Sequence, residues 1–422
     1  MPLPARPLYD PFIGTVTQTH RLRAVCQIYV NGYDVSPKLD PHLINMHVID
    51  GPHAALHVEL DDRDGRLPLP PLDSNIIVSI GWYNEPLWKV FGGVIFDIEH
   101  GFGRDQGGRR LWIHATGTNW KIGKNSEMNS WGEGDPVSGQ GQQVPLKQVL
   151  QDAFESQGLN IAVHSKFANI MRNFWMQNME SALHMGQRMA NEHGALFRVT
   201  DGNQGVFTDY GQNADGSNTA VINAKWGDNL IGWRVHPIIA RSTWSGSAQT
   251  WYDSITSKFG DIASSFSQNG ISGGAGSSQF SHSGSAANKN NAGQDNSGVQ
   301  NKVQNEFGDG RIVINGEPRA AWNCGVQLIG ARPGVDGLYR ATQVEHIYSR
   351  EGFITWVDVF PVYVEGGTNV YAGGLIQAAD GRTYTIEDYN IWAAGTQTGA
   401  GGVGPGNPTN STTNSDGGAA ST

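Results

Sequence analysis

Among the patterns in this sequence, a group of four histidines is the one most similar to a set of metal ligands. His42, His47, His53 and His57 lie close together, and imidazole nitrogens are common ligands of zinc and related metals. Neither an HExxH pattern nor a closely spaced cysteine pair accompanies them. In addition, Gly51-Pro52 interrupts the strand that His53 would need in order to share a face with His57. The sequence therefore favours structural roles for these histidines, and we expect no metal ligands among them.

Two adjacent pairs, Glu99-His100 and Glu345-His346, contain the residue types of general acid–base catalysis. Both pairs stand in segments with strand patterns, where neighbouring side chains point to opposite faces. The members of a pair then cannot act on one substrate. We expect both pairs to be structural.

Other catalytic and ligand-binding motifs are missing from the sequence. There is no GxSxG elbow, the glycine-rich stretches lack the lysine of a phosphate loop, and Gly101-Phe102-Gly103 lacks the third glycine of a dinucleotide fingerprint. Asp61, Asp62 and Asp64 have no glutamate at the position of a calcium loop's bidentate ligand, so a solvated turn before Gly65 explains them better. We therefore expect no catalytic residue, no cofactor and no bound metal.

Composition indicates a β-rich protein and excludes several functional classes. Among 422 residues are 56 glycines and 13 tryptophans, a combination typical of strands joined by turns. The net charge of −10, without clustered Lys and Arg, argues against specific nucleic-acid binding. Cys26 and Cys324 each lie in an apolar run, which predicts two buried thiols and a reducing compartment. No signal segment and no apolar run of about eighteen residues is present, so we expect a soluble protein made in the cytoplasm, with no membrane contact.

Alternating apolar residues predict five or six strands in the first hundred residues, arranged as a small barrel or sandwich. The predicted strands include Val25–Val30, followed by a tight turn at Asn31-Gly32, and segments around 56–60, 76–82, 94–100 and 111–116.

Two helices are predicted in the middle of the chain, each followed by a glycine and a strand. The first begins near Pro145, ends at Gly158 and buries Leu146, Val149, Leu150, Ala153 and Phe154. For the second, we predict an N-cap at Asn178, Glu180 in the first turn, His193 in the last turn and a left-handed Gly194. Its predicted apolar face contains Met179, Leu183, Gly186 and Ala190. A hairpin through Leu196–Val199 and Val206-Phe207 should follow.

Strand patterns resume at 221–223 and 230–235 and return after Arg311, with turns at Asn315-Gly316 and Asp336-Gly337. Between them, residues 260–300 are dominated by Ser, Gly, Asn and Gln, which predicts a long flexible loop. The two β regions share a short internal sequence similarity. The tripeptides VNG and ING each end a strand. Ile98-Glu99-His100 and Val344-Glu345-His346 each lead through a loop into another strand. This similarity suggests a duplication.

The predicted organisation has five parts. These are an N-terminal extended arm (1–22), a first β unit (23–125), a mixed α/β region (126–224), a second β unit (225–362) with a flexible insertion at about 255–305, and a C-terminal arm with a disordered tail (363–422). The apolar stretch 371–392 within that last arm is compatible either with a terminal strand pair on the second β unit or with an arm that packs on a neighbouring subunit.

Together these features resemble the baseplate hub proteins of contractile-tailed phages, the late control gene D family, whose fold is shared by the N-terminal part of type VI secretion VgrG spikes. The resemblance covers roughly residues 23–362. In the first β unit it rests on Phe91–Ile95 and the 111–120 strand. In the middle of the chain it rests on the Pro145 helix and on Gln177 with the helix that ends at Glu192-His193-Gly194. The later positions that match are Gly316, Pro318, Gly325, Asp336–Tyr339, His346 and the strand from Phe353. Trp322-Asn323-Cys324 departs from the family pattern, as does the length of the 260–300 segment.

The resemblance implies a mainly β fold in which two tube-type β-barrel domains flank a mixed α/β region, without an active site. It also implies a homotrimer that joins the six-fold tail tube to a three-fold central spike and leaves a channel for DNA. The implied partners are the tail tube protein, the central spike protein, and baseplate wedge and tape-measure proteins. The implied location is the virion tail baseplate, assembled in the host cytoplasm. A carbohydrate- or receptor-binding β-rich tail protein is the alternative, because Trp and Tyr stack on sugars. A cell-wall hydrolase is disfavoured by the missing carboxylate pair.

Overall fold

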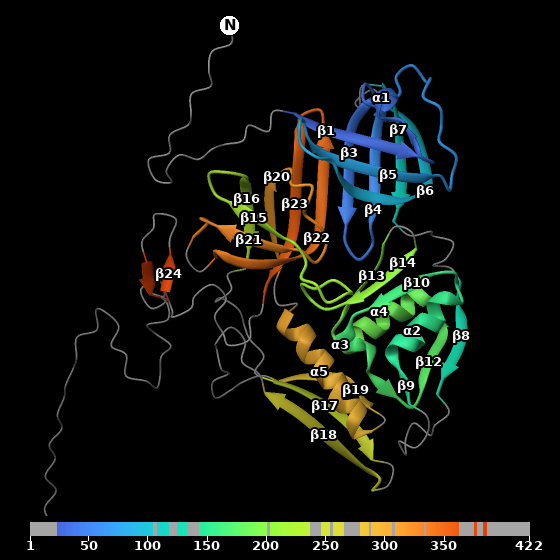
Figure 1. Ribbon diagram of the computed structural model, residues 1–422, viewed down its shortest axis with the longest axis vertical. Helices are drawn as coiled ribbons and strands as arrows, with labels where there is room; N and C mark the ends of the chain where they lie inside the picture. The colour runs from blue at the N-terminus through green and yellow to red at the C-terminus, as the bar shows by residue number, and fades with distance from the viewer. Residues whose placement is uncertain are drawn as a thin grey trace, which may run out of the picture.

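The computed structural model describes residues 23–103, 108–117, 125–132, 143–200, 203–236, 246–253, 256–265, 279–286, 288–305, 309–332, 335–362, 375–377 and 383–385. Within them the protein is mainly β; helices α2 to α5 lie near one another in the lower half of Figure 1, whereas the short α1 lies at the top with the first β unit. The predicted N-terminal arm lies outside the described residues, as does most of the C-terminal arm. None of the described helices is long and apolar enough to cross a membrane.

The first β unit follows the sequence prediction closely. Alternating burial in its strands places one apolar face inward, around a core that includes Met46, Ile80 and Ile95. Asn31 and Gly32 both have positive φ, as the predicted tight turn requires. The elements are β1 (Ala24–Val30), β2 (Tyr33–Asp34), α1 (Ser36–Leu39), β3 (Leu43–Asp50), β4 (Ala55–Asp61), β5 (Asn75–Trp82), β6 (Trp88–Gly103) and β7 (Gly108–Thr116).

The middle of the chain forms a separate apolar cluster around two helices, drawn in green in Figure 1. Helix α2 begins directly after Pro145 and buries the five predicted apolar residues, and Gly158 has the positive φ expected after its end. The elements are β8 (Glu127–Trp131), β9 (Val144–Pro145), α2 (Leu146–Glu155), β10 (Asn160–Val163), α3 (Ser165–Ala168), β11 (Met171–Arg172), β12 (Trp175–Glu180), α4 (Ala182–His193), β13 (Leu196–Thr200) and β14 (Gln204–Thr208).

The start of α4 differs from the prediction. Its N-cap is Ser181, whose hydroxyl accepts a hydrogen bond from the His184 N–H, whereas Asn178 and Glu180 belong to β12. Pairing between β12 and the distant β8 extends the strand past Asn178, with an irregularity at Met179, which has positive φ and is exposed. Non-local strand pairing thus overrides the local cap signal. The predicted helix end is confirmed, because Gly194 is left-handed.

The second β unit begins with β15 (Val221–Lys225), a few residues before the predicted boundary at 225, because β15 pairs with β21. Its other strands are β16 (Leu230–Val235), β20 (Gly310–Asn315), β21 (Gly325–Ile329), β22 (Gly337–Ser349) and β23 (Gly352–Pro361), and they enclose a third apolar cluster. The Asn315-Gly316 turn prediction is wrong, because neither residue has positive φ, the turn residues are 318 and 319, and β20 pairs with the distant β23 rather than with β21, the next strand. Gly316 has a packing role instead, since a Cβ there would lie 2.0 Å from the Phe353 ring.

The flexible-loop interpretation of residues 260–300 is wrong for the described part of that segment. It contains β18 (Lys258–Ser265), which pairs with β17 (Gly246–Asp253), then β19 (Gln279–Ala286), and helix α5 (Lys289–Asn305). The small residues that make the composition look disordered allow α5 to approach α4 closely. A Cβ on Gly298 would lie 2.4 Å from the Glu192 carbonyl oxygen, while Ala292 and Val299 are buried. The small side chains of α5 therefore permit close packing against α4 rather than preventing it.

A single 13-stranded sheet links the two β units, and no closed barrel is detected among the described strands. The link is the antiparallel pairing of β22 with β3, from Val344 opposite Asp50 to Ser349 opposite Asn45. The first half of β22 pairs instead with β21, and a register irregularity lies between Ala341 and Gln343. Because a bulge bends a strand and increases its twist, this irregularity allows β22 to serve both units.

Two remaining predictions concern the cysteines and the C-terminal arm. Cys26 and Cys324 are free and buried, as expected, and burial raises their pKa values to about 12 and about 11. In the C-terminal arm, β24 (Leu375–Gln377) and β25 (Thr383–Thr385) pair with each other and not with the second β unit.

Candidate functional site at the junction of the three units

Three side chains from different parts of the sequence meet where the two β units and the middle unit join. Arg198 of β13 donates a hydrogen bond from Nη1 to Asp50 Oδ1 at the end of β3, over 2.7 Å. The other oxygen of Asp50 accepts from the Trp322 backbone N–H at 2.8 Å, and the Arg198 guanidinium lies 4.7 Å from the Trp322 ring centroid. Asp50 therefore connects all three units, and the cation–π contact adds to the ion pair.

Asn323 supplies the second connection, between the middle unit and the second β unit. It is almost fully buried and has positive φ, a conformation that Asn tolerates better than most residues. Its side-chain oxygen accepts from the Gly211 N–H at 2.8 Å, and its amide nitrogen donates to the carbonyl oxygens of Asp209 and Gln212. All of these backbone groups belong to the connection that follows β14, so one side chain fixes that connection against the second β unit.

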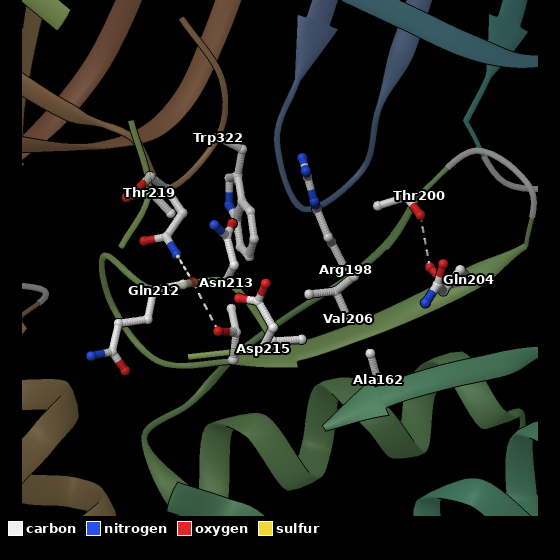
Figure 2. A pocket seen from close by; sticks show the side chains of 13 residues that line it. Ala162, Arg198, Thr200, Gln204, Val206, Gln212, Asn213, Asp215, Thr219 and Trp322 are labelled. Carbon is white, nitrogen blue, oxygen red and sulfur yellow. Dashed lines mark hydrogen bonds between the residues drawn. The ribbon is translucent and has the colours of Figure 1, made fainter. Parts of the chain in front are cut away.

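A pocket of about 390 Å³ opens beside this junction. Figure 2 shows Arg198 extending from β13 toward the loop between β3 and β4, with the Trp322 ring beside it and Ala162 at the base. The remaining lining is mostly uncharged and polar, including Thr200, Gln204 and Asn213.

The pocket lacks a pair of groups suited to acid–base or nucleophilic catalysis. Its described lining contains two titratable residues, Arg198 and Asp215. Arg198 is engaged by Asp50, and hydrogen bonds from Ser217 hold the pKa of Asp215 below its usual value, so that this carboxylate stays ionised and is a weak base. The arrangement of the pocket is that of a structural junction.

The four histidines singled out from the sequence do not form one cluster, although two of them, His47 and His57, are neighbours. His42 Nδ1 lies 2.9 Å from the Asp61 carbonyl oxygen, and His53 stands in the bend between β3 and β4. His47 and His57 are cross-strand partners on β3 and β4. The closest imidazole contact of His57 is with His114 of β7, a residue that the sequence pattern did not select.

The two Glu-His pairs have separate structural environments. His346 is fully buried, between the Thr355 hydroxyl at 3.2 Å and the Ala320 carbonyl oxygen at 3.1 Å, and burial lowers its pKa to about 4. His100 is exposed and lies 3.4 Å from an Asp62 carboxylate oxygen.

The solvated-turn interpretation is wrong for Asp62. This residue is buried, and its Oδ1 accepts hydrogen bonds from the Arg66 and Leu67 backbone N–H groups. Asp62 therefore organises the turn from inside, in the manner typical of short side chains that bond to nearby backbone.

Solved structures of other proteins share this architecture. No protein-family model matches the chain, and no curated protein sequence matches it. Among solved structures, the 43 kDa tail protein of prophage MuSo2 from Shewanella oneidensis aligns with a TM-score of 0.54 and 14% identity, over 80% of this chain and 98% of that one. The tail protein from Neisseria meningitidis MC58 aligns with a TM-score of 0.54 and 12% identity, over 82% and 97%.

The chain has the fold of phage tail proteins. The Escherichia coli c3393 protein, a component of the type VI secretion system, aligns with a TM-score of 0.45 and 11% identity, over 82% of this chain and 79% of that one. Within this tail-protein fold, the local sequence pattern gave no signal for Asp50 or Arg198, because their contacts depend on strands that are far apart in the chain.

Proposed function

We propose that this protein is a structural baseplate hub of a phage tail or a related contractile injection device. In this proposal, residues 23–125 and 225–362 form two tube-type domains that flank the mixed region. Three copies then present six such domains to the tail tube and three-fold symmetry to the central spike, around a channel through which DNA passes. Baseplate wedge and tape-measure proteins are further partners, and the virion tail baseplate is the location.

The observation that carries the proposal is the edge-to-edge pairing of β3 with β22. It joins the two β units of one chain in the way that neighbouring domains of a ring must be joined, with strand edges paired rather than left open. The Asp50–Arg198–Trp322 contacts hold that join in one geometry. The tail-protein fold supports the same conclusion.

The ends of the main sheet offer a way to close the ring. The sheet begins at β16 and ends at β2, and exposed apolar side chains lie near both ends: Trp226 and Ile231 at one, and Tyr33 at the other. Large exposed apolar side chains at open strand edges are typical of surfaces that are covered by a partner. We place the β15–β16 end of one copy against the β1–β2 end of the next.

Reconstruction of the purified protein by electron microscopy, without imposed symmetry, tests the proposal. The expected result is a trimeric ring with six similar lobes around a central channel. Six copies in the ring, or lobes that do not superpose, would contradict it.

A carbohydrate-binding tail protein is the second candidate, favoured by the exposed aromatic side chains of Tyr83 and Trp88 around the turn between β5 and β6. A glycan array with the purified protein separates the two functions. Specific glycan binding that is lost in Trp88→Ala would support the second candidate, whereas the hub requires no glycan binding.

A further inference from the structure

A cluster of potential metal ligands lies on the solvent-facing side of the first β unit. Asp97 and Glu99 of β6 and His114 of β7 each offer one ligand atom, and these atoms all lie within 4.8 Å of one another. Cross-strand pairing creates the cluster, since Asp97 is opposite His114 in the register. The same register places His57 of β4 opposite His114 on its other side.

The donor distances are close to those of an occupied site. His114 Nε2 and Glu99 Oε1 are 4.0 Å apart. Ligands of a tetrahedral zinc ion, each about 2.0–2.2 Å from the metal, lie roughly 3.4 Å from one another. The ligand atoms must therefore approach by less than about 1.5 Å. The Glu99 side chain is 64% exposed and can make this movement by rotation.

The hydrogen bond between His57 and His114 determines which ring nitrogen of His114 is unprotonated. An unprotonated nitrogen that faces the carboxylates has a lone pair with which to bind a metal. The two Nδ1 atoms lie 2.6 Å apart, and one of them must carry the proton of this hydrogen bond. When His114 Nδ1 donates to His57 Nδ1, His114 Nε2 is left unprotonated on the side of Glu99. Metal-bound histidines commonly donate their second ring N–H to a neighbouring acceptor in this manner.

We propose that Asp97, Glu99 and His114 bind a divalent transition-metal ion of the Zn²⁺ class, with His57 as a positioning residue for His114. One imidazole and two carboxylates form a mixed nitrogen and oxygen donor set, which suits zinc or cobalt better than magnesium. Water completes the coordination at this exposed surface. The site is independent of the proposed hub function, because it uses only the outer face of β4, β6 and β7.

Isothermal titration calorimetry of the full chain with zinc chloride tests the proposal, and visible absorption of the Co²⁺-loaded protein reports its coordination. We expect one equivalent of zinc to bind, and His114→Ala and Glu99→Gln each to weaken binding by at least about 10-fold. His100→Ala is the matched control. It removes an imidazole from β6, the strand of Asp97 and Glu99, but this imidazole is outside the cluster, and the change should leave zinc binding unchanged. Glu99→Gln changes an exposed side chain, so that its result does not depend on tolerance of substitutions at His114.

His57 has its own test. His57→Ala should weaken zinc binding about 10-fold, and His57→Asn, whose Oδ1 can accept from His114 Nδ1, should restore it. A wild-type protein that binds no zinc, or binding that survives both His114→Ala and Glu99→Gln, would overturn the site. Equal affinity in the two His57 variants would overturn the positioning role.

Discussion

At the scale of residues, Asp50 and Arg198 show how few side chains hold three units together. Asp50 accepts hydrogen bonds from two different units, so its removal leaves Arg198 and the Trp322 N–H without their partner at a mostly buried position. Such unpaired groups cost more than the mean value of a hydrogen bond.

We predict that Asp50→Ala lowers the free energy of unfolding by about 2 kcal/mol, measured by urea denaturation. The matched control is Arg63→Ala, which removes an ion pair on the protein surface and should cause no measurable change. Equal stability of Asp50→Ala and wild type would show that the junction is held by strand pairing alone.

His346 gives the protein a defined response to acid. The Glu317 N–H donates to the Thr355 hydroxyl, which can donate to His346 Nδ1, while His346 Nε2–H donates to the Ala320 carbonyl oxygen. Burial of His346 disfavours the charged, doubly protonated ring, because this ring would lose its hydration. The folded protein therefore keeps the ring neutral, with a pKa of about 4, whereas the unfolded chain takes up a proton near pH 6.5.

The sign of the pH effect follows from these two pKa values. Above pH 6.5 neither state is protonated and the stability is fully present. As the pH falls from 6.5 to 4, the unfolded state binds the extra proton and stability is lost, with a slope of up to about 1.4 kcal/mol per pH unit for this histidine. Buried His193, with a pKa of about 3, acts in the same direction. Urea denaturation as a function of pH should show a smaller slope for His346→Leu than for the wild-type protein, and an equal slope would contradict this role of His346.

At the scale of elements, the sequence correctly predicted the helices and strands whose buried residues recur with a regular helical or strand period. The Pro145 helix and the strands of the first β unit belong to this group, since their burial follows a simple period. The start of α4 was missed because the pairing of β12 with β8 decides it. The joining of β3 with β22, about 300 residues apart, leaves no local signal. For the proposed metal site, His57 was visible in the sequence, but His114 became its neighbour only through the register of β4 and β7; for the junction site, neither Asp50 nor Arg198 had a local signal.

Helix α5 illustrates a different limit, because composition alone does not distinguish a polar linker from a helix with small contact residues. Besides the close approach of Gly298 to α4, Asn301 donates from its amide to the Gly194 carbonyl oxygen at 2.6 Å, and Arg172 forms an ion pair with Asp295.

We predict that Gly298→Ala separates α5 from α4, because the added methyl would overlap the backbone at Glu192 and His193. Hydrogen exchange of the α5 amides should become faster. Gly293→Ala is the matched control on the same helix, where the nearest atom to the new Cβ is 3.9 Å away. This control should leave exchange unchanged or slow it, since Ala favours helix over Gly by about 1 kcal/mol. Equal exchange in both variants would refute the tight contact.

At the scale of the whole molecule, the proposed trimer depends on covering the apolar end of the sheet at β15 and β16. We predict that Ile231→Lys converts the trimer to monomers, because a buried charge at a subunit interface is costly without a partner. Analytical ultracentrifugation measures the change. Phe259→Lys is the control, because Phe259 is more exposed than Ile231 but lies on β18, outside the main sheet. A trimer that survives Ile231→Lys would exclude this end of the sheet from the interface.

Under the proposed function, in which the protein belongs to a contractile device, strand β22 also has a mechanical consequence. Its six residue pairs with β3, from Val344 to Ser349, are loaded together when the two β units are pulled apart along the strands, because the hydrogen bonds lie across the direction of pull. Rupture in such shear requires several bonds to fail at once, whereas peeling breaks them one after another. The two units would then behave as one stiff plate under axial load, and any compliance would be located in the connections around the sheet rather than at the join itself.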